Sequence, residues 1–304
     1  MNIIIITGIN GFVGKHLTRE LKKYNHSVIG IGMEPEAHPE IRELLDGYYN
    51  EDLSIGWPKI QDASAIIHLA GLAAVGPSFD NPQKYININS SIVTNMCEYY
   101  LKQDKKPRIV MVSSGAIYDS NVKMPITELS PIAYTSPYTV SKILLENQAA
   151  YYTSRGIECV VMRPFNHVGP GQLPGFLVPD LAQKIRARSS NNEPIKVGNL
   201  KTKRDYTDVR DVVRAYRLVA TKEGKLDYPV YNVCSGVSHD GEKVLDAIVS
   251  VMDIERPLIE VDEKFLRPND TMDIRGDNSR LVTELGWKPT IPFEQTITDF
   301  VKSL

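Results

Sequence analysis

The sequence predicts an α/β protein built on a doubly wound parallel sheet, with a smaller α/β lobe toward the C-terminus. Short apolar runs alternate with helical patterns through the first half of the chain, and strands and helices at this spacing form βαβ crossovers. After Pro164 the composition changes, because glycine and proline crowd residues 164–179 and the later elements are shorter. We therefore expect one unit over 1–163 and a second over 164–304, with some segments of the second returning to the first.

The expected elements of the first unit alternate regularly. Its strands are short runs dominated by apolar and β-branched residues, as the buried strands of a parallel sheet require, and its helices carry apolar residues at helical spacing. In chain order we expect strand 3–7, helix 15–24, strands 28–31 and 65–69, helix 90–101, strand 109–112, helix 138–153 and strand 158–163.

The composition excludes several classes of partner. A net charge of −2, with 35 basic residues in no long run, lacks the electrostatic signature of a nucleic-acid binder. Cys97, Cys159 and Cys234 are far apart and form no CxxC pair, so neither a disulfide framework nor a metal site is expected. No stretch approaches the roughly 20 apolar residues of a membrane span, and the first apolar run is too short for a signal sequence. We expect a cytoplasmic protein without a membrane or nucleic-acid partner.

Residues 7–14 read TGINGFVG and lie between the first strand and the first helix. Glycines there allow a tight turn and a close approach of the backbone to a pyrophosphate, whose charge then lies at a helix N-terminus. The spacing is GxxGxxG, not the GxGxxG of most dehydrogenases. The motif predicts a Rossmann-type fold that binds NADPH or NADH through Gly8, Asn10, Gly11, Phe12, Val13 and Gly14.

The end of the second strand bears on the choice between the two cofactors. An acidic residue there bonds the adenosine 2′-hydroxyl of NAD, whereas an arginine accommodates the 2′-phosphate of NADP. The expected acidic position holds Gly32, no arginine follows directly, and the nearest acid is Glu34. The sequence leaves the preference open.

A third pattern joins a tyrosine, a lysine and a strand-end serine. Tyr138 and Lys142 are four residues apart, so they lie on one face of the expected helix, and a nearby ammonium favours the tyrosinate and lowers the tyrosine pKa. Ser113 and Ser114 directly follow the apolar run 109–112, which brings their hydroxyls to the edge of the sheet. The pattern is specific only in combination with the glycine motif.

These motifs together resemble the extended short-chain dehydrogenase/reductases, in their nucleotide-sugar branch. The resemblance covers essentially the whole chain and includes His68-Leu69-Ala70-Gly71, Asp52-Leu53 and Arg163-Pro164-Phe165-Asn166. It implies that Ser114, four residues before Tyr118, is catalytic together with Tyr138 and Lys142, and that Ser113 is structural. It adds Asp52, Leu53, Leu69, Ala70 and Gly71 to the cofactor site, which Tyr138 and Lys142 also contact.

The two residues after Ser114 bear on the reaction. Family members that are 4,6-dehydratases carry acids there, because they must move two protons to expel water. Gly115 and Ala116 cannot transfer protons, so a dehydratase is disfavoured. Serine, tyrosine and lysine remain, which suffice to transfer a hydride at one carbon and a proton at its oxygen.

The second half of the chain is similar to GDP-4-keto-6-deoxy-D-mannose reductases, in the strings at 165–172, 197–200, 204–211, 231–236, 266–268 and 286–289. The resemblance implies a substrate site at Ser114, Asn166, Lys184, Arg204, Arg267 and Asp270. The two arginines suit phosphate oxygens, since a guanidinium presents a fork of donors. We interpret His167 as a structural loop histidine.

The expected activity is therefore NAD(P)H-dependent reduction of the C4 ketone of a nucleotide-linked 4-keto-6-deoxyhexose. A nucleotide-sugar 4-epimerase with tightly bound NAD would use the same three catalytic residues, and a non-catalytic NAD(P)-binding module is a further alternative. The resemblance also implies a homodimer formed through helices 90–101 and 138–153, whose apolar residues are Met96, Tyr100, Leu101, Leu144, Leu145 and Tyr152. Each stripe could instead face its own sheet.

Overall fold

A seven-stranded sheet, parallel throughout, forms the centre of the first unit. The computed structural model describes residues 2–60, 62–188, 194–266 and 271–304. The strand order is β10-β6-β5-β4-β1-β2-β3. The strands are β1 (Ile3–Thr7), β2 (Ser27–Gly32), β3 (Gly47–Asn50), β4 (Ala65–His68), β5 (Arg108–Val112), β6 (Cys159–Pro164) and β10 (Val230–Val233). The expected doubly wound sheet is confirmed, with β3 and β10 as additional edge strands.

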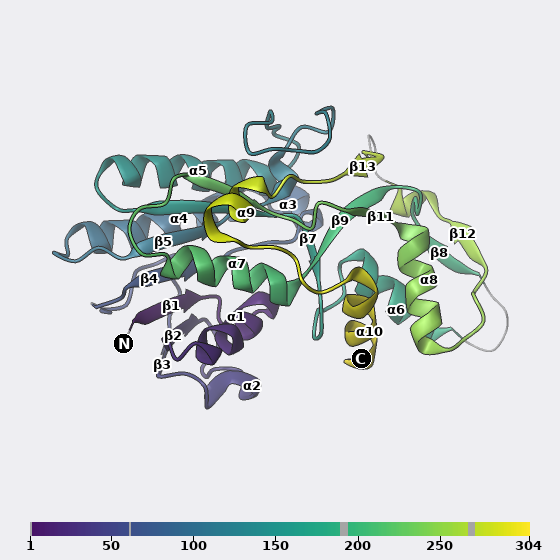
Figure 1. Cartoon of the computed structure of the whole chain (residues 1–304), viewed down its shortest axis with the longest axis horizontal. Helices are drawn as coiled ribbons and strands as arrows, with labels where there is room; N and C mark the ends of the chain where they lie inside the picture. Colours follow the sequence, from purple (N-terminus) through teal and green to yellow (C-terminus); the bar gives the residue numbers. More distant parts are fainter. Residues whose placement is uncertain (1, 61, 189–193, 267–270) are drawn as a thin grey trace.

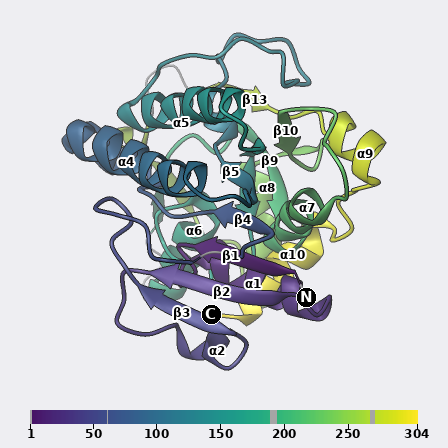
Figure 2. The same cartoon turned by 90° about the vertical axis from the view of Figure 1, so that its left-hand side faces the viewer.

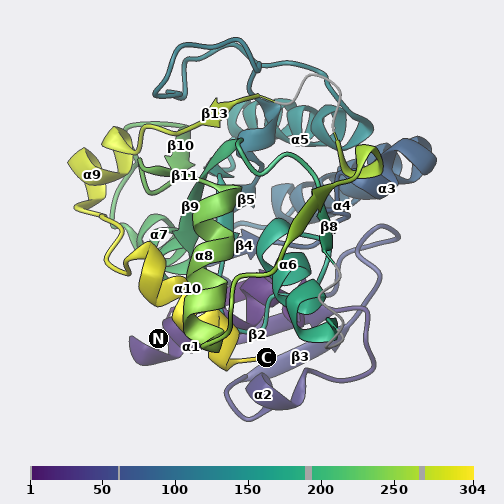
Figure 3. The same cartoon turned by 90° about the vertical axis from the view of Figure 1, so that its right-hand side faces the viewer.

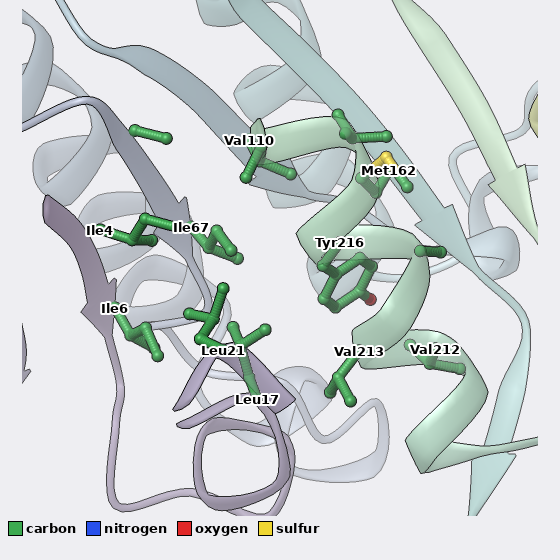
Figure 4. Packing of buried hydrophobic residues seen from close by; sticks show 14 of the residues in the cluster. Ile4, Ile6, Leu17, Leu21, Ile67, Val110, Met162, Val212, Val213 and Tyr216 are labelled. Carbon is green, nitrogen blue, oxygen red and sulfur yellow. The ribbon is translucent and has the colours of Figure 1, made fainter. Parts of the chain in front are cut away.

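Helices cover both faces of this sheet (Figure 1 and Figure 2). On one face lie α4 (Pro82–Leu101) and α5 (Pro137–Ser154); on the other lie α1 (Phe12–Lys23) and α7 (Val209–Thr221). The short helices α2 (Pro39–Arg42) and α3 (Gly76–Asp80) follow β2 and β4. Figure 4 shows side chains of β1, β4, β5 and β6 packed against those of α1 and α7.

Helix α4 begins eight residues before its expected start. Pro82 occupies the first turn, a position that suits proline, and Asn81 is its N-cap. The buried face of α4 includes the polar Asn89, which interrupts the apolar spacing in the sequence. The start signal was therefore present, but the periodic pattern concealed it.

The C-terminal lobe packs a second, smaller core (Figure 3). Strands β7 (Asn166–Val168), β9 (Lys203–Asp208), β11 (Ser238–Asp240) and β13 (Asp273–Ile274) form one sheet, and β8 (Ile195–Val197) pairs with β12 (Ile259–Val261). The helices are α6 (Leu177–Ala187), α8 (Gly241–Met252) and α10 (Phe293–Lys302).

Several segments after residue 163 pack with the first unit. Strand β10 extends the large sheet, α7 covers it, and Leu281 of α9 (Ser279–Leu285) is buried in the same core as Trp287. The Asp211 carboxylate on α7 accepts from the backbone N–H groups of Thr290 and Ile291 at 2.8 and 2.9 Å. The backbone carbonyl of Asp211 accepts from the Trp287 indole N–H at 3.0 Å. The C-terminal segment is thus bound to the outer helix of the first unit.

The apolar residues expected at a dimer interface are largely used within the chain. Met96, Tyr100, Leu145 and Tyr152 are buried in the core beneath α4 and α5, and Leu101 is packed against that core. These four buried residues face their own sheet, so they do not mark an interface, and the homodimer remains a prediction. Within the described ranges, no helix has the length and apolar character to cross a membrane.

Candidate active site

The glycine-rich turn joins β1 to α1 as a dinucleotide site requires. Gly8 has φ +67°, and a Cβ at this position would come within 2.9 Å of the Ala70 backbone nitrogen, so only glycine fits. Helix α1 begins at Phe12, its N-cap Gly11 offers no side-chain cap, and its first turn carries no acid. Backbone N–H groups at such a helix end suit an anion. The residues therefore fit the pyrophosphate of NAD(P).

A buried hydroxyl holds the turn after β4, where Leu69, Ala70 and Gly71 were predicted to contact the cofactor. Thr7 Oγ1 accepts from the backbone N–H groups of Leu69 and Ala70, both at 3.1 Å, and lies 2.8 Å from His68 Nδ1. Because these two bonds use both lone pairs of the hydroxyl, its proton goes to His68 Nδ1. Burial lowers the pKa of His68 to about 3, so the ring is neutral and fixes this arrangement.

The predicted cofactor residues after β3 serve local structure. Asp52 accepts from the backbone N–H and the hydroxyl of Ser54, at 2.9 and 2.7 Å, and forms a turn. Leu53 is buried in the core beneath α4, and its carbonyl accepts from Asn95 at 2.9 Å. Both lie just beyond the carboxyl end of β3, beside the strand that ends at Gly32.

Glu34 reaches back over the end of β2. A Cβ built on Gly32 would lie 2.9 Å from Glu34 Oε2 and 2.7 Å from the Tyr48 hydroxyl, so the carboxylate occupies the space that a side chain at position 32 would need. Asn10 of the glycine-rich turn donates to the same oxygen at 2.8 Å and accepts from the His38 N–H at 2.8 Å. Asn10, Glu34 and His38 line an open cavity of about 450 Å³.

The three predicted catalytic residues lie together at the carboxyl edge of the sheet. Ser114 follows β5 in extended conformation, and its Oγ accepts from Ala116 N–H at 3.1 Å. Helix α5 starts at Pro137, capped by Ser136 and Thr139 in a reciprocal capping box, which places Tyr138 in the first turn. Lys142 Nζ donates to the Val112 carbonyl at 2.8 Å and lies 5.9 Å from the centre of the Tyr138 ring.

Burial dominates the electrostatics of this site. It raises the pKa of Tyr138, against the opposing effect of a hydrogen bond with Ser114. It also lowers the pKa of Lys142 to about 8, against the opposing charge of Glu146. The net lowering of the tyrosine pKa that was expected from Lys142 is not met, because burial raises this pKa. Tyr138 is therefore protonated at neutral pH and can donate a proton.

The two positions after Ser114 hold no acid. Gly115 lies against Phe165, since a Cβ on it would come within 3.0 Å of that ring, and Ala116 follows. Ser113 is buried, in agreement with a structural role. Among the described residues, no cluster of three or more His, Cys, Asp or Glu side chains could hold a metal ion.

The predicted substrate residues lie toward the C-terminal lobe. Asn166 is exposed at the start of β7, directly after Phe165. Lys184 on α6 donates to the Lys196 carbonyl at 2.7 Å and lies 4.0 Å from the centre of the Phe265 ring. Arg204 on β9 donates to the carbonyls of Lys203 and Thr271, both at 2.8 Å. Arg267 and Asp270 lie outside the described residues.

The histidine beside Asn166 has a structural environment. His167 Nδ1 lies 3.1 Å from the Phe165 carbonyl, and its ring stacks parallel to Phe12 of α1 at a centroid distance of 6.1 Å. Burial lowers its pKa, so it is neutral. His167 lies in strand β7, paired with Thr207 of β9, and not in a loop as expected, but its contacts agree with a structural role.

Three supporting residues escaped the sequence analysis. Thr7 and His68 fix the cofactor turn, and Asn89 of α4 bonds both backbone groups of Leu72 and the Ser141 hydroxyl. The available signal was a polar side chain inside an otherwise apolar strand end or helix face. Such a residue is buried only with partners, but the sequence does not identify them.

Comparisons with known proteins agree with this geometry. The GDP-6-deoxy-D-mannose reductase of Pseudomonas aeruginosa is 29% identical over 300 residues, covering 97% of this chain and 94% of that protein. The UDP-glucose 4-epimerase of Bacillus subtilis is 27% identical, covering 97% and 95%. The solved structure of RMD from Pseudomonas aeruginosa complexed with NADPH has a TM-score of 0.82 at 28% identity and covers 100% of this chain and 98% of that one.

A family model described as the NAD dependent epimerase/dehydratase family matches residues 4–234, from the first strand of the large sheet to the end of its last. That span holds the glycine-rich turn, Ser114, Tyr138 and Lys142. The chain belongs to the NAD dependent epimerase/dehydratase family and is an NAD(P)-binding enzyme of the extended short-chain dehydrogenase/reductase type.

Proposed function

We propose that the protein is an NAD(P)H-dependent reductase of the C4 ketone of a nucleotide-linked 4-keto-6-deoxyhexose, with GDP-4-keto-6-deoxy-D-mannose as its first candidate substrate. The observation that carries the proposal is the assembly of Ser114, a protonated Tyr138 and Lys142, with no acid at the two positions after Ser114. The similarity to a GDP-6-deoxy-D-mannose reductase over 97% of the chain supports it.

Each residue of the site has a separate role in the reduction at C4. The nicotinamide, when bound, supplies the hydride. Ser114 donates a hydrogen bond to the ketone oxygen, and Tyr138 transfers its proton to that oxygen as negative charge develops. Lys142, oriented by the Val112 carbonyl, stabilises the resulting tyrosinate and holds the nicotinamide ribose. The N-terminus of α1 binds the pyrophosphate of the cofactor.

The substrate side of the proposal rests on Asn166, Lys184, Arg204, Arg267 and Asp270. We assign the arginines to the substrate pyrophosphate and Asp270 to the nucleoside, with Asn166 near the sugar phosphate. Lys184 lies over the ring of Phe265, and the backbone of Phe265 packs against Gly198, which lines a second cavity of about 250 Å³. A homodimer is proposed on the family resemblance alone.

For the cofactor, the geometry at β2 supports NADH. The Glu34 carboxylate lies where an acidic strand-end residue would bond the ribose 2′-hydroxyl, and Arg42, the cation in the cavity lining, is already paired with Glu36. A 2′-phosphate would meet two carboxylates and one neutralised guanidinium. The structure of RMD complexed with NADPH describes that relative only.

Two assays with one protein preparation test the proposed reaction. With GDP-4-keto-6-deoxy-D-mannose, we expect absorbance at the reduced-nicotinamide band to fall, with one cofactor consumed per ketone reduced. With GDP-mannose, we expect no 4-keto-6-deoxy product, because dehydration needs two titratable groups beside the sugar. Formation of that product would refute the reductase assignment. Interconversion of C4 epimers without net cofactor consumption would identify the protein as an epimerase. Inactivity with every keto sugar would favour a non-catalytic NAD(P)-binding module.

A further inference from the structure

A buried arginine at the end of β6 connects the two elements that carry the catalytic residues. Arg163 donates from Nε and Nη2 to the two carboxylate oxygens of Glu146, at 2.9 and 2.6 Å. Its Nη1 donates to the Tyr118 hydroxyl at 2.8 Å and to the Glu128 carbonyl at 3.1 Å. The side chains of Arg163 and Glu146 are only 8% and 13% exposed.

Two of the partners of Arg163, Tyr118 and Glu146, lie four residues along the chain from a catalytic residue. Tyr118 closes the single turn that begins at Ser114, and its hydroxyl donates onward to Asn232 at 2.6 Å. Glu146 lies on α5 one helical turn beyond Lys142. A planar guanidinium with fork geometry holds both partners in fixed directions, which a lysine would not do.

Few charged groups surround Lys142 in the described part of the chain. Glu146 on α5 favours its charged form, whereas His68 on β4 is buried and neutral. Tyr138 on α5 is protonated, and from β5 the ammonium meets the uncharged carbonyl of Val112. Glu146 in turn faces Arg163 on β6 and the Tyr118 phenol. Glu146 is thus bonded to Arg163 and lies one helical turn from Lys142 on the same face of α5, so its carboxylate neighbours both cations.

We propose that Glu146 and Arg163 are positioning residues that set the protonation of Lys142, with Glu146 keeping the ammonium charged and Arg163 limiting how strongly it does so. The proposal deepens the proposed function, since it rests on the role assigned to Lys142. Removing the carboxylate takes away the anion that favours charge on Lys142 and leaves Arg163 without its carboxylate partner. Removing the guanidinium takes away the cation bonded to Glu146, so that the carboxylate acts on Lys142 without that opposing charge, which favours the charged form of Lys142.

The two halves of one ion pair are thus expected to have opposite effects. Glu146→Gln should shift the titration midpoint of Lys142 downward by about one pH unit, the scale of a neighbouring charge, and Arg163→Met should shift it upward. A pair that served folding alone would lower stability in both variants without opposite shifts. The signs therefore distinguish tuning of Lys142 from simple structural support.

Two readouts measure the shift. Competitive acetylation of the free enzyme with acetic anhydride across a pH series, read by mass spectrometry, gives the midpoint of Lys142 without any substrate. The alkaline limb of the pH profile of kcat/KM gives the same titration midpoint during catalysis. The matched control is Glu20→Gln, which breaks the buried Glu20–Arg217 pair between α1 and α7, whose side chains are each 10% exposed and 2.9 Å apart. The control should leave the Lys142 midpoint unchanged.

Opposite shifts in the two variants support the inference, and shifts of the same sign, or none, overturn it. If Arg163→Met does not fold, Glu146→Gln still decides, because a midpoint equal to or above that of the control contradicts the proposal. Because acetylation measures the midpoint without substrate, this test does not depend on the proposed reaction. An enzyme that reduces no keto sugar but shows the expected midpoints would refute the reductase assignment and leave this inference standing.

Discussion

Replacing Glu34 by glutamine tests how the chain chooses its cofactor. The carboxylate lies over Gly32, bonded to Asn10, at the edge of an open cavity. Glutamine keeps one acceptor oxygen and the approximate shape but removes the charge. A hydrogen bond to a charged group contributes about 1.5–3 kcal/mol, and the exposed position of Glu34 favours the lower value. We therefore expect NADH to bind roughly 10-fold more weakly.

The same substitution should improve NADPH binding. A carboxylate close to a 2′-phosphate repels it by about 1 kcal/mol or more at contact distance, even at the dielectric constant of water. Its removal should therefore strengthen NADPH binding by roughly 5-fold or more. The ratio of the two dissociation constants should change by roughly 50-fold in total.

Fluorescence titration of the reduced cofactors measures both constants without substrate. Glu43→Gln serves as the control, because Glu43 is exposed at the C-cap of α2 and lies outside the cavity lining. A wild-type protein that binds NADPH more tightly than NADH would refute the reasoning. So would a Glu34→Gln variant whose ratio equals that of the control.

Three further predictions concern catalysis, stability and assembly. Tyr138→Phe should bind NADH almost normally but lower turnover with the keto sugar by roughly 10² or more, the scale of general acid–base catalysis; near-normal turnover would remove Tyr138 as the proton donor. Because folding lowers the pKa of His68 from 6.5 to about 3, the unfolded chain binds a proton between these values that the folded chain excludes. The free energy of unfolding from urea titrations should therefore fall as pH decreases from 7 to 5. In the His68→Asn variant this free energy should fall less steeply with pH, and equal slopes in the two proteins would contradict the prediction. Static light scattering at micromolar concentration should give the mass of a dimer, and a stable monomer would exclude the proposed assembly.

The parts of the fold that depend on local pattern could be predicted from the sequence. Buried parallel strands such as β1, β5 and β6 are continuous apolar runs, and the glycine-rich turn lies directly between a strand and a helix. β3 reads Gly-Tyr-Tyr-Asn and is only partly buried, so no such run marks it. β10 comes far along the chain and joins the sheet only through its pairing with β6.

The site residues also differ in whether local sequence pattern could predict them. The local pattern placed Tyr138 and Lys142 on one helix face and Ser113 and Ser114 at the end of a strand, whereas the choice of Ser114 and the catalytic roles came from the family resemblance. The reach of Glu34 over Gly32, and the pairing of Glu146 with Arg163, depend on side-chain directions set by tertiary packing. Lys184 and Arg204 were predicted by resemblance, and their bonds to carbonyls of the lobe are equally invisible in the sequence.

The bond network at Asp211 has a consequence for biosynthesis. Leu281 and Trp287 complete the core between the large sheet and α7, although they come far later in the chain than the glycine-rich turn. A ribosome synthesises from the N-terminus, and a domain usually folds when its own residues have emerged. The core behind the glycine-rich turn therefore stays incomplete until Leu281 and Trp287 have emerged. Until then the nascent chain exposes apolar surface of the large sheet, so chaperone occupancy should persist until these two residues leave the ribosome.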